Sequence, residues 1–177
     1  MPAARTGTKP EGKTRQLTLT GELATVTPLP SSSKSRSKSS IERTYTNAIL
    51  PIKPEYMELI AEREKNHEYR KYKLRDTVTR IWLYTTAPTS AISHVMVTSH
   101  PKTPGQVRDP NGVGNDDFDN GKKVSKFGYP VLGLYKLKTP LKPEAMKAHG
   151  VSPPQGCVYA PKKMVDEMPL EDMEKLF

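Results

Sequence analysis

The sequence contains little cysteine, few aromatic residues and no long apolar run. Of its 177 residues one is cysteine and one is tryptophan, and the hydrophobic fraction is 34%. A single cysteine excludes an intramolecular disulfide and favours a reducing compartment. No apolar run approaches the ~18 residues of a membrane-spanning helix, and the first residues lack the apolar core of a secretory signal. We therefore expect an intracellular protein, cytoplasmic or nuclear, with no membrane partner.

Acidic residues are also scarce relative to basic ones. The chain has 28 Lys and Arg residues against 19 Asp and Glu residues, a net charge of +9. Such an excess attracts polyanions, of which nucleic acid is the common case. A solvated basic protein without a dedicated polyanionic partner would have the same composition.

The charge is unevenly distributed. Residues 1–45 hold eight basic and three acidic residues, about half of the net excess, and include the low-complexity run Ser31–Ser40. A segment so poor in apolar residues cannot offset its ordering entropy by burial. We expect residues 1–45 to be a disordered basic tail rich in Ser, Pro and Lys, and residues 46–177 to form one domain. The tail would add sequence-independent phosphate attraction, so selectivity must come from the domain.

Hydrophobic periodicity predicts the elements of the domain. The predicted strands are 47–52, 68–72, 80–85, 91–98, 131–138 and 157–159, and the predicted helices are 54–66, 143–149 and two short segments on either side of Pro169. In the first helix Tyr56, Leu59 and Ile60 share one face. Residues 101–129 show no period and are predicted to be a functional or mobile loop.

The strands follow one another too closely for a doubly wound parallel sheet. The pattern instead favours an α+β fold, a small β-barrel of five to six strands with short helices at its ends.

A polar cluster is predicted where the first helix gives way to a strand. Lys65, Glu68 and Arg70 lie within six residues. The guanidinium of Arg70 suits a phosphate or a base edge, Lys65 is a mobile point charge, and Glu68 could accept from a base amino group or act as a general base. Since Glu68 and Arg70 are two residues apart on a strand, they share a face. A purely structural ion pair is therefore the alternative interpretation.

The basic residues between Arg63 and Arg75 alternate with Tyr69 and Tyr72. Basic and aromatic groups in one stretch are typical of surfaces that bind single-stranded nucleic acid. A solvated charged face would have the same pattern.

The run ILPIKPEYMELIAEREKNHEYRKY resembles the opening of the ASCH domain, a branch of the PUA-like superfamily. The family signature G-x-K-x-x-E-x-R is matched at Lys65, Glu68 and Arg70, but Arg63 stands at the glycine position. Glycine permits a positive φ that arginine adopts only at a cost. The segments IWLYTTAPTSAI and GYPVLGLYKLKTPLKPEAMKAHGVSPPQGCVYAP resemble the second strand with its hairpin and the closing part of the family. The resemblance covers residues 47–160.

The resemblance implies a PUA-like barrel that binds RNA or other nucleic acid in a cleft between the barrel and the opening helix. Lys65, Glu68 and Arg70 would line this cleft, with Lys53 and Tyr84 beside them. Tyr69 or Tyr84 could stack on an unpaired base. We therefore expect a nucleic-acid-binding module for RNA or for a modified nucleobase or nucleoside.

Two other functions stay open. Some proteins of the family deacetylate N4-acetylcytidine and some cut RNA, so Lys65 and Glu68 could serve a small hydrolase. The acetylcytidine hydrolases, however, have a threonine where this chain has Glu68, and binding is favoured over catalysis. A protein-interaction adaptor, acting through the tail and the 101–129 loop, is the second alternative.

No cofactor is expected. The four histidines, His67, His94, His100 and His149, lack metal-ligand spacing. The oligomeric state is left open.

Overall fold

The computed structural model describes residues 40–177. Most of the predicted tail, residues 1–39, lies outside the described residues. The first strand begins at Arg43, four residues before the predicted start at Asn47. No helix within the described residues is long and apolar enough to cross a membrane.

Six strands form one mixed sheet, in the order β7-β1-β3-β4-β6-β8. Their bounds are β1 Arg43–Ile52, β3 Arg80–Thr85, β4 Ala91–Val97, β6 Gly133–Leu141, β7 Val158–Pro161 and β8 Glu174–Lys175. β1 and β3 are parallel, and the other neighbours are antiparallel. A parallel pair needs a crossover connection. Here the crossover contains α1 (Pro54–Ala61) and β2 (His67–Arg70).

The sheet is not closed into a barrel, so the predicted barrel is corrected to an open sheet within an α+β fold. β7 and β8 are the two edges. They have four and two residues, and each pairs with one neighbour. β2 pairs only with β5 (Phe127–Pro130), in a separate two-stranded sheet. Periodicity detects individual strands, but closure depends on which edges meet in three dimensions.

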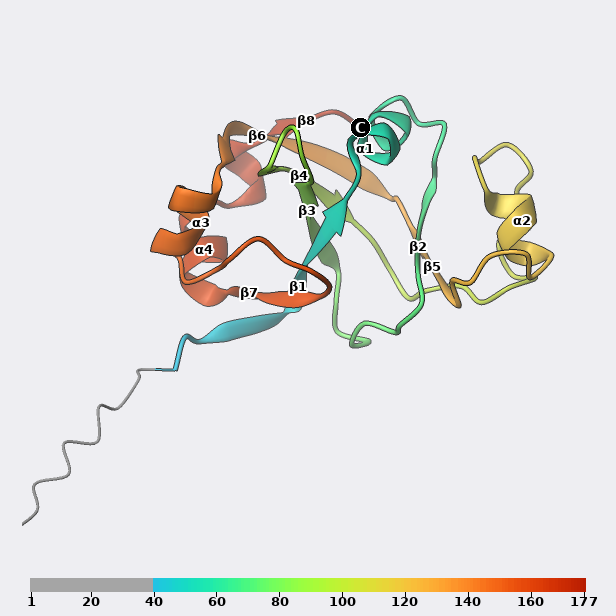
Figure 1. Cartoon of the computed structure of the whole chain (residues 1–177), viewed down its shortest axis with the longest axis horizontal. Coiled ribbons are helices and arrows are strands. Elements are labelled where there is room, and N and C mark those ends of the chain that lie inside the picture. Colours follow the sequence, from blue (N-terminus) through green and yellow to red (C-terminus); the bar gives the residue numbers. More distant parts are fainter. Residues whose placement is uncertain (1–39) are drawn as a thin grey trace, which may run out of the picture. The chain divides into compact units, whose positions relative to one another are not determined.

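Apolar residues cover both faces of the large sheet, because successive strand residues point to opposite sides. Leu50 and Leu83 belong to a cluster with Met57 and Ile60 of α1. The other cluster contains residues of the opposite face together with side chains of two C-terminal helices, α3 (Pro143–Ala148) and α4 (Lys162–Glu167). The sheet therefore lies between α3 and α4 on one side and β2 and β5 on the other (Figure 1). A final 3-10 turn spans Leu170–Asp172.

Helix α1 is shorter than predicted and is rotated relative to the predicted apolar face. It begins at Pro54, as expected, and ends at Ala61. Met57 and Ile60 are its buried residues, whereas the Tyr56 side chain is turned outward and is 45% exposed. The apolar positions of a short helix fit more than one face, and packing on the sheet selects one of them.

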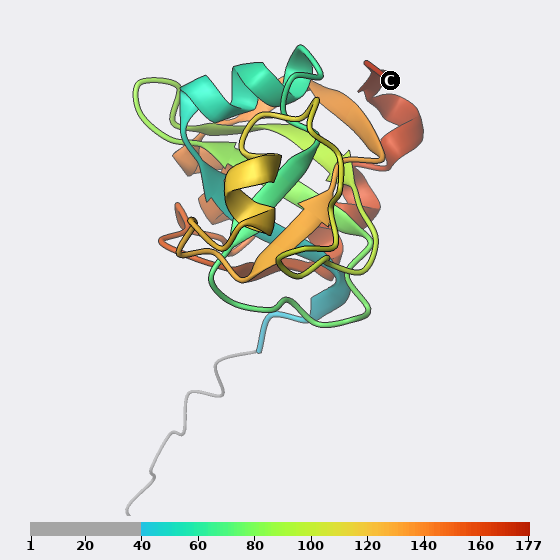
Figure 2. The same cartoon turned by 90° about the vertical axis from the view of Figure 1, so that its right-hand side faces the viewer.

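The 101–129 segment is more ordered than predicted. It contains α2 (Asn115–Asp119) and the start of β5, and it packs beside β2 (Figure 2). The carboxylate of Asp119 accepts hydrogen bonds from the backbone N–H groups of Gly105, Val107 and Arg108 at 2.7–3.1 Å. Such side-chain-to-backbone bonds organise a segment without any hydrophobic period, which is why the sequence pattern did not reveal this order.

Candidate functional site

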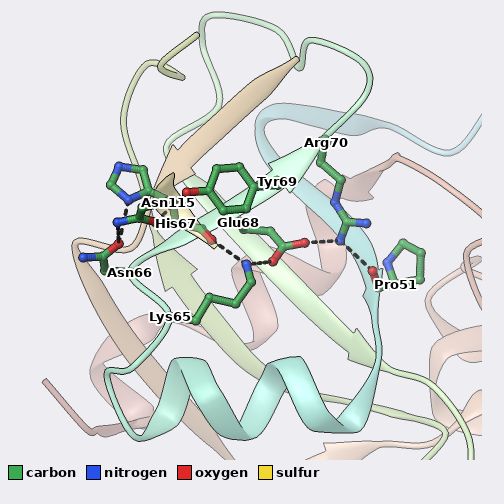
Figure 3. A network of polar contacts seen from close by, with 8 residues as sticks. All are labelled: Pro51, Lys65, Asn66, His67, Glu68, Tyr69, Arg70 and Asn115. Carbon is green, nitrogen blue, oxygen red and sulfur yellow. Dashed lines mark hydrogen bonds and ion pairs between the residues drawn. The ribbon is translucent and has the colours of Figure 1, made fainter. Parts of the chain in front are cut away.

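The three residues of the predicted cluster form one line of ion pairs (Figure 3). Glu68 lies in the centre. Its Oε2 is 2.5 Å from Lys65 Nζ, and its Oε1 is 2.9 Å from a terminal nitrogen of Arg70. Lys65 Nζ also donates to the carbonyl of His67, and Arg70 donates to the carbonyl of Pro51 at 2.6 Å. The structural ion pair considered from the sequence is thus present, and it includes both cations.

These charges are largely removed from water. The side chains of Lys65 and Glu68 are each 7% exposed, and that of Arg70 is 18% exposed. Burial lowers the pKa of Lys65, opposed by the adjacent Glu68 carboxylate. The Arg70 Nε is buried and has no hydrogen-bond acceptor among the described residues. Buried ion pairs contribute little net stability, but each partner depends strongly on the other.

Arg63 positions Lys65 through a left-handed turn after α1. Its φ is +65°, so this position has the conformation that favours the glycine of the family signature. The Lys65 backbone N–H then donates to the carbonyl of Leu59 at 2.9 Å. The Arg63 guanidinium lies 4.3 Å from the centroid of the Phe177 ring, a favourable cation–π contact.

We expect Arg63→Gly to be more stable than Arg63→Ala by about 1–2 kcal/mol, because both lose the contact with Phe177 and only glycine adopts a positive φ without strain. Urea unfolding of both variants measures this difference. Equal stabilities would contradict a left-handed conformation at residue 63.

A pocket of about 310 Å³ adjoins the ion pairs between α1 and β2. Its lining residues are Pro51, Ile52, Lys53, Tyr56, Glu68, Tyr69, Arg70 and Thr86. Three of the five predicted site residues, Lys53, Glu68 and Arg70, therefore meet in one place. Tyr56 and Thr86 also line the pocket, and the sequence analysis did not predict them as site residues. Tyr56 had been placed on the buried face of α1, and no sequence signal brings Thr86, just beyond β3, to this pocket.

Lys65 and Tyr84 do not line this pocket. Lys65 lines a smaller depression of about 230 Å³ with Arg63, Asn66, Val131 and Phe177. Tyr84 is buried in the apolar cluster on the other face of the sheet, so its predicted place in the cleft is wrong.

Tyr69 is held in a polar network rather than available for stacking. Its hydroxyl donates to Asn115 Oδ1 at 2.5 Å, and its ring packs on Phe118 with centroids 4.5 Å apart. Asn115 also donates to Asn66 Oδ1, which lies 2.8 Å from His67 Nδ1 (Figure 3). The network joins the 101–129 segment to β2 and so fixes the strand that carries Glu68 and Arg70.

The basic run between Arg63 and Arg75 does not form one continuous surface. Lys65 and Arg70 contact Glu68, and Arg63 lies over Phe177. The run is therefore interrupted, because Lys65 and Arg70 are largely buried, whereas Arg63 and the basic residues after Arg70 are exposed. Within residues 40–177, no three His, Cys, Asp or Glu side chains gather in a way that could hold a metal ion.

No protein-family model and no curated protein matches the sequence. Three solved structures share the fold, all of an ASCH protein from Zymomonas mobilis. The unmodified protein aligns with a TM-score of 0.55 and 16% identity, covering 70% of this chain and 94% of that one. A point mutant aligns with a TM-score of 0.53 and 16% identity, covering 71% and 95%. The chain therefore has an ASCH-type fold, as its motifs predicted.

Proposed function

We propose that this protein binds single-stranded RNA and holds one unpaired or modified base in the pocket between α1 and β2. The observation that carries the proposal is the composition of this pocket. A half-exposed aromatic ring, two cations and a buried carboxylate line one small cavity.

Each of these groups has a role in recognising a nucleotide. The ring of Tyr56 offers a stacking face, and the exposed ammonium of Lys53 offers a phosphate contact. Each oxygen of Glu68 makes one ion pair and keeps capacity for another donor. Glu68 could thus accept from the exocyclic amino group of cytosine or adenine. The ion pair with Arg70, at 2.9 Å, holds the carboxylate in position beside the pocket.

The size of the pocket supports a single base. At about 310 Å³ it lies at the lower end of the ~300–1,000 Å³ range of ligand pockets. A base in a duplex could not enter without leaving its stack, so unpaired RNA is favoured over duplex nucleic acid.

Tyr56→Ala is expected to weaken binding of a labelled oligocytidylate by roughly 1–3 kcal/mol, the contribution of one base stacked on an aromatic ring. Fluorescence anisotropy with the full chain measures this loss. Because the Tyr56 side chain is 45% exposed, the melting temperature should change little.

Tyr135→Ala is the matched control, since Tyr135 lies in β6 and does not line the pocket. It should leave the affinity within about twofold of the wild type, as expected for a site without direct contact. Unchanged binding by Tyr56→Ala would overturn the proposal.

A hydrolase of acylated nucleosides is the second candidate. Thr86 supplies a hydroxyl group to the pocket that Glu68 lines, which the motif itself does not. Release of cytidine from N4-acetylcytidine, detected by chromatography and lost in Thr86→Ala, would support this activity. No turnover by the wild-type protein would exclude it.

A further inference from the structure

An exposed basic segment follows directly after β2. Lys71, Tyr72 and Lys73 are all exposed, and the Tyr72 side chain is 38% exposed. The segment is nevertheless anchored, because Leu74 is buried and its backbone N–H donates to the Tyr129 hydroxyl at 2.6 Å. Lys71 and Lys73 are thus presented from a fixed backbone beside the pocket that contains Arg70.

The next residue, Arg75, extends this segment to two tyrosines. Its guanidinium carbon lies 4.1 Å from the ring centroid of Tyr45 and 5.6 Å from that of Tyr159. The two rings meet edge to face at 5.2 Å, and Tyr45 is 48% exposed. A guanidinium stacked on an aromatic face still offers its N–H edge to a phosphate. Arg43 adds a further cation here, since its side chain donates to the Tyr159 carbonyl at 2.6 Å.

The charge of this surface is strongly positive. We define the strip as Tyr45, Lys71, Tyr72, Lys73 and Arg75. The acidic group in contact with it is Asp76, 2.7 Å from Lys73. The Cα atoms of Lys71 and Arg75 are at most about 14 Å apart, a span that a short run of nucleotides can follow.

We propose that the strip carries the RNA strand where it leaves the pocket. Its cations bind successive phosphates, and the exposed faces of Tyr72 and Tyr45 are platforms on which bases stack. The strip has the two properties of a sequence-tolerant single-strand surface, a basic track and spaced aromatic rings. This inference rests on the proposed function, because it assumes that the pocket holds one base of the same strand.

The experiment measures binding of two probes to the full chain. One is a labelled oligocytidylate of about 12 nucleotides, within the length range that one such surface binds. The other is cytidine monophosphate. For Lys71→Ala/Arg75→Ala we expect about tenfold weaker binding of the oligonucleotide. Its logarithmic salt dependence should become shallower by about 1.4, since each lost contact with single-stranded phosphate contributes ~0.7. Binding of cytidine monophosphate should be unchanged, because neither residue lines the pocket.

Lys136→Ala/Lys138→Ala is the matched control, which removes two exposed lysines from β6. It should alter neither the affinity nor the salt slope beyond the small effect of net charge. Melting curves check that each variant is folded. Lys71→Glu is a second variant, in which Arg75 keeps its cation–π contacts with Tyr45 and Tyr159.

The outcomes separate the two proposals. If the strip variants bind the oligonucleotide with wild-type affinity and salt dependence while Tyr56→Ala binds it more weakly, the proposal for the strip is wrong and the proposal for the pocket is supported. If Tyr56→Ala changes the affinity for neither probe, the proposal for the pocket is wrong, whatever the strip variants show.

Discussion

Glu68→Ala is expected to destabilise the folded domain by roughly 3–5 kcal/mol, because it leaves a buried ammonium and a largely buried guanidinium without their common partner. Lys65 Nζ and Arg70 are 2.5 and 2.9 Å from the Glu68 carboxylate, and the Lys65 side chain is 7% exposed. Burial already lowers the pKa of Lys65, so loss of the carboxylate should lower it further and favour the neutral amine. Urea unfolding monitored by circular dichroism measures the loss.

Lys65→Met should cost clearly less than Glu68→Ala. Methionine fills a similar volume without a charge, and Glu68 keeps its contact with Arg70. Glu55→Ala is the control, because Glu55 is exposed and lies 3.6 Å from an exposed Lys53. It should change stability by at most about 0.5 kcal/mol. A loss below about 1 kcal/mol for Glu68→Ala would contradict the buried ion pairs.

The second large effect is loss of stability in mild acid. Burial is the main cause that lowers the pKa of His67 from 6.5 to about 4, with Lys102 and Lys65 adding to it. Burial, and then Lys136, lowers the pKa of His94 to about 4 as well. Between pH 6.5 and 4 the unfolded chain binds protons that the native protein does not, so stability falls as the pH falls through this window.

Each imidazole can contribute up to about 3 kcal/mol to this loss, and His94, which is partly exposed, should contribute less. These contributions are absent above pH 6.5 and complete below pH 4. Unfolding free energies measured at pH 7 and at pH 4.5 provide the test.

The matched comparison uses His67→Gln and His100→Gln. The first should make the pH dependence clearly weaker, whatever it costs at neutral pH, because it removes one of the two titrating groups and leaves His94. The second replaces a histidine that is well exposed and should leave the pH dependence as it is. A wild-type stability equal at pH 7 and pH 4.5 would contradict neutral, buried imidazoles.

The sequence by itself determined the local elements and the ion-pair cluster. Pro54 marked the start of α1, and RIWLYT marked β3, because helix starts and buried strands have signals within a few residues. The spacing of Lys65, Glu68 and Arg70 indicated groups that meet, since neighbours in a short segment cannot move far apart. Arg63 at a glycine position correctly drew attention to the left-handed turn.

Tertiary structure alone decided what surrounds that cluster. Packing of α1 on the sheet placed the Tyr56 side chain at the pocket, and the sheet placed Tyr84 on its other face. Strand pairing left the sheet open, and side-chain-to-backbone hydrogen bonds from Asp119 ordered a segment with no period. Local patterns specify how a segment is built, whereas faces, edges and pockets depend on contacts between residues distant in the chain. For this reason the motif could be predicted from the sequence and the pocket could not.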